Sequence, residues 1–184
     1  GKYLGEAIVM ACEGIDPCTV AFLIGFEGFP LDLDRLAAVE DIIAEYPNIS
    51  IVSTQAANYT AEDGNSVTAN ILQANPDISV IASVGDQMIV GAEIAAQDAG
   101  IEGIKFIGQG GSQDGYAAVT EGRWFATVAN IPFTNGQIAA QMALQAIDGT
   151  LIIRSVDMYN QAPPFPASGP VITQENAADF TPQW

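Results

Sequence analysis

The side chains of this 184-residue chain that could do chemistry stand directly after five apolar runs. They comprise one cation, one aromatic ring, amide and carboxylate groups, and glycines that leave the backbone bare. Gathered around one pocket, such groups bind and orient a small molecule, and the pattern therefore indicates a binding cleft. In chain order they are Arg35 after the first run, Asn58 and Tyr59 after the second, Gly85 and Asp86 after the third, Gln109 and Gly110 at the fourth, and Asn130 after the fifth.

The composition excludes several other kinds of chemistry. The chain has no histidine, so neither a Ser–His–acid nor a Cys–His catalytic set can be built. Two cysteines without histidine cannot fill the four positions of a zinc site. We therefore predict no catalytic residue, no metal and no cofactor. The net charge of −17, with only five lysines and arginines, argues against nucleic acid as a partner, because phosphate binding needs clustered positive charge.

The glycine-rich turn at residues 108–115 differs from a dinucleotide-binding loop. The third glycine of that fingerprint would fall at Gln113, and no acid follows at the distance of the ribose. We interpret the turn as a sharp strand-to-helix connection whose glycines let a ligand approach the backbone closely.

The five apolar runs lack in-and-out alternation, which is typical of strands buried on both faces. Each is followed by an amphipathic helical stretch, so we predict an α/β fold: a parallel sheet of about five to six strands flanked by helices on both faces. The carboxyl ends of parallel strands meet at one edge, where such sheets bind ligands. The expected strands are 19–24, 49–54, 78–83, 104–107, 125–129 and 171–173, and the expected helices are 3–10, 32–46, 61–74, 86–99, 112–121 and 133–147, with a helical turn at 175–180.

Three local features carry further expectations. Asp32 and Asp86 stand where they could cap the helices that follow them, and Gly100 is placed to end a helix. Cys12 and Cys18 are six residues apart around Gly14 and Pro17. They are either two buried thiols or, if the protein is exported, a short disulfide.

The order and spacing of several motifs resemble the periplasmic ribose-binding-protein family, the type I solute-binding proteins of sugar ABC transporters. The resemblance covers about residues 1–149. The motifs that carry it are Asn75–Asp77, Ser83–Met88, Gly91-Ala92, Lys105–Gly108, Ala126–Asn130 and Pro132.

This resemblance implies one lobe of a protein that closes two α/β lobes on a sugar. Residues 1–130 would form the C-terminal lobe, 131–165 a crossover helix and Pro-rich segment that belongs with a missing N-terminal lobe, and 166–184 a tail returning to the first part. The apolar face of helix 133–147 would then need a partner, which predicts self-association or repacking. That face consists of Ile138, Met142, Leu144 and Ile147.

The family's ligand positions can be carried over one at a time. Arg35 matches the cleft arginine, Tyr59 the aromatic that lines the sugar site, and Asn130 the amide that ends the fifth strand. Gly85 and Gly110 replace an asparagine and an aspartate, so two polar groups are absent. The resemblance thus implies a ligand that is different or larger, or a gap filled by Gln109 and water.

We therefore expect a non-catalytic binding component of an ABC importer, with a carbohydrate ligand and the membrane permease as partners. It would work outside the cytoplasm, in the periplasm or lipid-anchored at the cell surface, with its signal absent from this chain. The alternative is the effector-binding core of a lac-repressor-like transcription regulator, against which a disulfide would argue. A flavodoxin-like enzyme would need a phosphate loop after the first run, where residues 25–30 carry bulky aromatics instead.

Overall fold

A six-stranded sheet organises the computed structural model, which describes residues 1–152, 155–156 and 165–184. The strand order is β2-β1-β3-β4-β5-β6; the first five strands are parallel, and β6 pairs with β5 in the antiparallel direction. The expected α/β sheet is therefore confirmed, and the strand expected at 171–173 differs from the expectation only in running antiparallel to its neighbour. The strands are β1 (Cys18–Ile24), β2 (Ile49–Ala56), β3 (Val80–Ser83), β4 (Lys105–Gly110), β5 (Ala126–Ala129) and β6 (Val171–Ile172).

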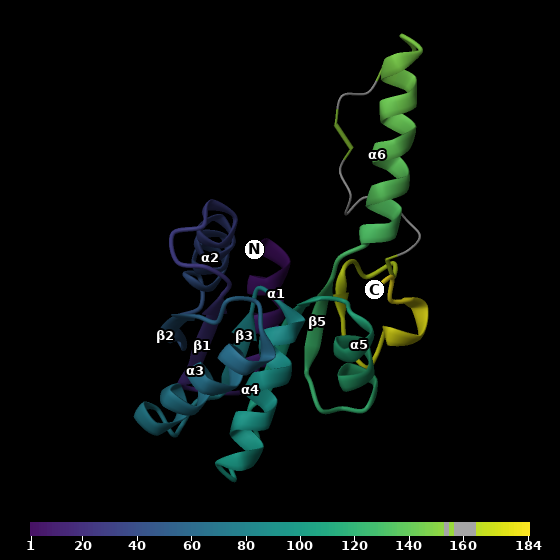
Figure 1. Cartoon of the computed structure of the whole chain (residues 1–184). Coiled ribbons are helices and arrows are strands. Elements are labelled where there is room, and N and C mark those ends of the chain that lie inside the picture. Colours follow the sequence, from purple (N-terminus) through teal and green to yellow (C-terminus); the bar gives the residue numbers. More distant parts are fainter. Residues whose placement is uncertain (153–154, 157–164) are drawn as a thin grey trace.

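Helices cover both faces of the sheet (Figure 1). The helices α1 and α2 pack together on one face, and α3, α4 and α5 lie on the other, where α4 contacts β3 and β4. The bounds are α1 (Lys2–Ala11), α2 (Pro30–Ile43), α3 (Ala61–Ala74), α4 (Asp86–Asp98), α5 (Gln113–Thr120) and α6 (Pro132–Ile147), with a 3-10 turn η2 (Ala177–Asp179).

The core lies along the central strands, as the unbroken apolar runs require. All four residues of β3 are buried, and so are Phe22 and Leu23 of β1 and Ile107 of β4. Burying one such side chain contributes about 1.5–3 kcal/mol of stability. The edge strand β2, which pairs only with β1, is less covered: Ile49 is buried, and most of the following residues alternate between partly buried and exposed positions.

The expected start of one helix and the capping role expected of two aspartates are wrong. The helix α2 begins at Pro30, because proline fits the first helical position, so Asp32 lies inside the first turn. The helix α4 begins at Asp86 after the N-cap Gly85, and the Asp86 side chain makes no capping bond because its oxygens are used elsewhere. Gly100, by contrast, has φ +66° directly after α4 and ends that helix as expected.

Cys12 and Cys18 form a disulfide that joins the end of α1 to the start of β1. Of the two states that the sequence left open, the structure therefore has the bonded one, and both cysteines belong to the buried core.

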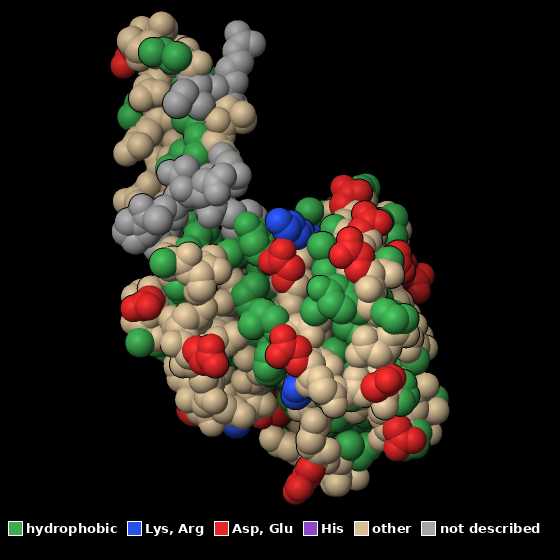
Figure 2. All heavy atoms as spheres, turned by 180° about the vertical axis from the view of Figure 1, so that it is seen from behind, with side chains coloured by type: hydrophobic (Ala, Val, Ile, Leu, Met, Phe, Trp, Pro, Cys, Tyr) green, Lys and Arg blue, Asp and Glu red, His purple; other side chains and the backbone are tan. Residues whose placement is uncertain are grey.

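The helix α6 extends away from the sheet (Figures 1 and 2). None of its residues is buried, and Phe133, Leu144 and Ile147 are 62–80% exposed. Residues Pro132–Ile147 include no charged side chain, although the chain carries a net charge of −17. After α6, residues 153–154 and 157–164, which include the start of the Pro-rich segment, lie outside the described residues. The chain then pairs with β5 through β6, and Phe165, Ile172 and Phe180 form a small second core.

Candidate functional site

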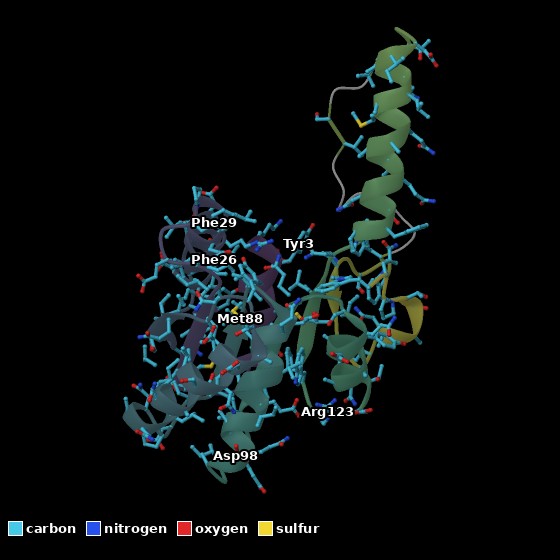
Figure 3. The ribbon with its side chains drawn as sticks, in the orientation of Figure 1. Tyr3, Phe26, Phe29, Met88, Asp98 and Arg123 are labelled. Carbon is cyan, nitrogen blue, oxygen red and sulfur yellow. A yellow bond between two sulfur atoms is a disulfide. The ribbon has the colours of Figure 1, made fainter. Side chains whose placement is uncertain are left out.

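The predicted site residues all lie at or next to the edge where the parallel strands β1 to β5 end. Figure 3 shows Phe26 and Phe29, from the loop after β1, at the end of the molecule from which α6 extends. Asp98 and Arg123 lie at the opposite end. The predicted residues form two groups at this edge, one around Tyr59 and one around Gly110.

Arg35, Tyr59 and Asp32 form a chain of polar contacts at the first group. Arg35 Nη1 donates a hydrogen bond to the Tyr59 hydroxyl at 3.3 Å, and that hydroxyl donates to Asp32 Oδ1. Arg35 Nη1 also lies 3.7 Å from Asp32 Oδ1, and the arginine side chain is 19% exposed. The sequence therefore placed Arg35 and Tyr59 together correctly, but the carboxylate that joins them was not among the predicted site residues.

The Tyr59 ring lies across the end of β1. A Cβ added at Gly25 would overlap the ring, and one added at Gly85 would lie 3.0 Å from Tyr59 Cδ1. Both Asn58 and Tyr59 have left-handed backbone, with φ 49° and 57°, which is unfavourable for a residue as large as tyrosine. The ring consequently reaches from the loop after β2, over β1, to the loop after β3.

Two phenylalanines extend this aromatic surface. The Phe26 ring meets the Tyr59 ring edge-on, with centroids 5.4 Å apart, and the Phe29 ring lies 6.3 Å from that of Phe26. Phe26 and Phe29 are 48% and 43% exposed. Sequence reasoning used these two residues only to exclude a phosphate loop. Their exposure directly after a buried strand is the signal that could have marked them as site residues.

Burial and the hydrogen bond to Asp32 together raise the pKa of Tyr59 to about 12. Burial disfavours the phenolate, and the neighbouring carboxylate disfavours a second negative charge beside it. Tyr59 is therefore a neutral hydrogen-bond donor at physiological pH, and its proton is directed at Asp32.

Asp86 lies just behind the edge, with 1% exposure. Its Oδ2 accepts from the Ser112 backbone N–H at 2.9 Å and from the Ser112 hydroxyl at 2.8 Å, and its Oδ1 accepts from the Thr127 hydroxyl at 2.8 Å. A Cβ at Gly110 or Gly115 would lie 2.8 or 2.6 Å from Asp86 Oδ2. The glycines of the 108–115 turn thus make room for this carboxylate, and burial raises its pKa.

Gly110 and Asn130 are neighbours in the second group. The Asn130 N–H donates to the Gly110 carbonyl at 2.9 Å, and Trp184 Nε1 donates to the same carbonyl at 3.0 Å. Gln109 is 4% exposed, and its Oε1 has no hydrogen-bond partner among the described residues. Trp184 was missed by sequence reasoning, because nothing local indicates that the tail returns to β4.

Two cavities mark opposite edges of the sheet. One of about 310 Å³ lies at the edge where the parallel strands end, between the first turns of α4 and α5, against Asp86, Ser112 and Trp184. A larger one of about 630 Å³ lies at the other edge, between Met10, Lys105 and Gln174. Of these two cavities, the larger is therefore the one that lies away from the predicted site residues.

Within residues 1–152, 155–156 and 165–184, no group of three or more Cys, Asp or Glu side chains is arranged to hold a metal ion. No helix among those residues combines the length and the apolar character needed to cross a bilayer.

Comparisons with known proteins agree with this architecture. The family described as Periplasmic binding protein domain matches residues 1–151. The chain is 29% identical over 150 residues to the ribose import binding protein RbsB of Salmonella typhimurium, an alignment that covers 81% of this chain and 49% of the relative. It is likewise 29% identical over 157 residues to the galactofuranose-binding protein YtfQ of Escherichia coli, covering 82% and 49% of the two chains. The chain thus spans about half the length of these curated relatives.

Solved structures give the same result. A periplasmic solute-binding protein of an ABC transporter from Actinobacillus succinogenes, crystallised with D-allose, superposes with a TM-score of 0.84 at 30% identity, over 97% of this chain and 59% of that one. The binding component of the arabinose ABC transporter from Shewanella superposes at 0.75 and 31% identity, over 96% and 57%. With one α/β lobe, a family match over residues 1–151 and these two structures, the chain belongs to the periplasmic binding protein domain family.

Proposed function

We propose that this chain is the C-terminal ligand-binding lobe of a sugar-binding protein that serves an ABC importer, and that it catalyses no reaction. The observation that carries the proposal is the edge itself: the Arg35 guanidinium, the Tyr59 ring and bare backbone at Gly85 and Gly110 lie where the parallel strands end. The relatives, which are named for binding ribose and galactofuranose, make a sugar the first ligand to test.

The ligand groups proposed for this edge are few. Arg35 and Asn130 supply donors, and Gln109 Oε1, which lacks a described partner, is an acceptor for a ligand hydroxyl. No side chain could be added at Gly110 without meeting Asp86 and Trp184. Asp86, whose oxygens are engaged by Ser112 and Thr127, supports the loop behind the ligand.

A second lobe is part of the proposal. The chain spans half of its relatives, and the exposed face of α6 with Phe133, Leu144 and Ile147 is the surface that another lobe would cover. Closure of two lobes on the ligand would remove it from water, and the membrane permease would receive it. In this proposal, residues 131–165 are the crossover between the lobes. Residues 166–184 return to the α/β lobe formed by residues 1–130, where β6 pairs with β5.

The proposed location is outside the cytoplasm. The Cys12–Cys18 disulfide supports it, because structural disulfides persist in oxidising compartments. The same bond disfavours the transcription-regulator alternative, which would work in a reducing cytosol.

Isothermal titration of the natural full-length protein with neutral pentoses and hexoses tests the proposal. We expect one sugar to bind, with amide shifts in a labelled 184-residue chain clustered after β1 to β5. The proposal fails if no sugar binds, or if the shifts cluster at the opposite edge around Lys105 and Gln174.

A further inference from the structure

The Asp32 carboxylate contacts three separate parts of the proposed ligand edge. Its Oδ2 accepts from the Phe26 backbone N–H at 2.9 Å, and its Oδ1 accepts from the Tyr59 hydroxyl. Arg35 Nη1 lies 3.7 Å from Oδ1. A single side chain of α2 therefore links the loop after β1, the loop after β2 and the arginine.

Asp32 is completely buried, with 0% exposure. Within the described part of the chain, the polar contacts of its carboxylate are with Phe26, Tyr59 and Arg35, and a buried carboxylate is retained only where donors and positive charge compensate its desolvation. Asp34, two residues later, is exposed and makes none of these contacts. Burial and contacts, rather than residue type, thus distinguish the two acids of this turn.

The backbone conformation at Tyr59 needs contacts that stabilise it. Two successive residues, Asn58 and Tyr59, hold left-handed φ values, a conformation that persists only when surrounding contacts fix it. The backbone bond from Asn58 N–H to the Gly25 carbonyl fixes the loop, and the hydroxyl bond to Asp32 and the packing of the ring on Gly25 fix the Tyr59 side chain.

We infer that Asp32 is the positioning residue of the proposed ligand edge, holding the Tyr59 ring in place and orienting the Arg35 guanidinium. The inference rests on the proposed function only where it assigns this edge to a ligand, since the contacts of Asp32 are present without a ligand. The inference has a chemical consequence. Because the Tyr59 hydroxyl donates its proton to Asp32, a bound solute would contact the Tyr59 ring and not receive that proton. The charge of Arg35 is balanced by Asp32, so this end of the edge suits an uncharged solute.

A tyrosine titration tests the inference without any ligand. In the 184-residue chain labelled with [4-¹³C]tyrosine, the Tyr59 signal, identified through Tyr59→Phe, should not shift below about pH 11, because its pKa is about 12. In Asp32→Asn, which keeps the size of the side chain, the Tyr59 midpoint should fall toward 10. The matched control Asp34→Asn should leave it unchanged. A midpoint in Asp32→Asn equal to that of the wild type overturns the inference.

The wild-type protein decides the question if Asp32→Asn does not fold. We then expect cross-relaxation between the Tyr59 ring protons and the α protons of Gly25 and Gly85. An ordinary midpoint near 10 for wild-type Tyr59, or the absence of this cross-relaxation, overturns the positioning role.

Sugar titration of the natural full-length protein separates the two proposals. Asp32→Asn should weaken binding by tenfold or more while Asp34→Asn does not. If the wild type binds no sugar, the proposed function fails, and the Tyr59 titration still decides the role of Asp32.

Discussion

Thr127 donates a hydrogen bond to Asp86 at 2.8 Å and so ties β5 to the first turn of α4, across 41 positions of sequence. With two further bonds from Ser112, the same carboxylate holds the loop after β4. The shape of one half of the proposed ligand edge therefore depends on a buried acid that is not in contact with solvent.

Asp86→Ala should lower the free energy of unfolding by roughly 2–4 kcal/mol, because Ser112 and Thr127 lose a buried acceptor. The exposed Asp114, in the first turn of α5, is the matched control, and Asp114→Ala should cost less than about 1 kcal/mol. Urea unfolding measures both values. Equal losses would contradict the role assigned to Asp86.

The raised pKa of Asp86 gives a defined pH dependence. Because the folded protein binds this proton more tightly than the unfolded chain, the stability contributed by the group is complete below the unfolded pKa of about 3.9 and declines as pH rises through the folded value. The unfolding free energy of the wild type minus that of Asp86→Asn should therefore fall as pH rises from 4, measured by urea unfolding at several pH values. A difference that increases with pH would refute this.

Glu93 supports the opposite edge. Its carboxylate accepts from Arg123 Nη1 at 2.6 and 2.7 Å and from Trp124 Nε1 at 2.9 Å, and Glu93 is 8% exposed. Glu93→Ala should cost roughly 2–4 kcal/mol, because the buried indole N–H loses its acceptor. Glu121→Ala, which removes the 60% exposed partner of the same Arg123, should cost less than about 1 kcal/mol in the same urea experiment. Similar costs for the two variants would argue against this difference.

Removal of the Cys12–Cys18 disulfide should reduce stability by about 2 kcal/mol, as expected for a short cross-linked loop. Urea unfolding of the double variant Cys12→Ser with Cys18→Ser against the oxidised wild type gives this difference. Titration of thiols under denaturing, non-reducing conditions should detect none in the wild type. Two reactive thiols would remove the argument for an oxidising compartment.

The uncharged, exposed face of α6 should make the isolated chain self-associate at high concentration. Leu144→Glu should abolish this association in sedimentation experiments, because a charge is placed among Phe133 and Ile147. Ala139 is exposed on another face of the helix, and Ala139→Glu should associate like the wild type. If the isolated chain is monomeric at every concentration, the prediction that the exposed face of α6 binds a partner surface is wrong.

Under the proposed function, Arg35→Ala should weaken sugar binding by the two-lobe protein by about 2–5 kcal/mol, because it removes the donor and leaves Asp32 buried without a cation. Lys105→Met, at the opposite edge, should leave the dissociation constant unchanged. Isothermal titration measures both, and an unchanged constant in Arg35→Ala would exclude the arginine from the site.

The sequence by itself predicted the elements that depend on local pattern. Apolar runs such as residues 19–24 identify strands covered on both faces, and the amphipathic stretches between them identify helices, because burial of these faces is the main driving force. Parallel strands end at one edge, so the positions of Arg35, Tyr59, Gly85, Gly110 and Asn130 followed from their place after each strand. The start of α2 and the capping roles of Asp32 and Asp86 were wrong, because Pro30 fits the first helical position and Gly85 serves as an N-cap without a side chain.

Tertiary structure alone decided what the carboxylates do. Asp32 and Asp34 are the same residue type in one turn, and Asp86 and Asp114 both lie in the first turn of a helix, yet of these four only Asp32 and Asp86 are buried. Their partners, Tyr59 and Thr127, are 27 and 41 positions away. Local propensity extends over a few residues, whereas the compensation of a buried charge depends on groups that only the folded sheet brings within hydrogen-bond distance.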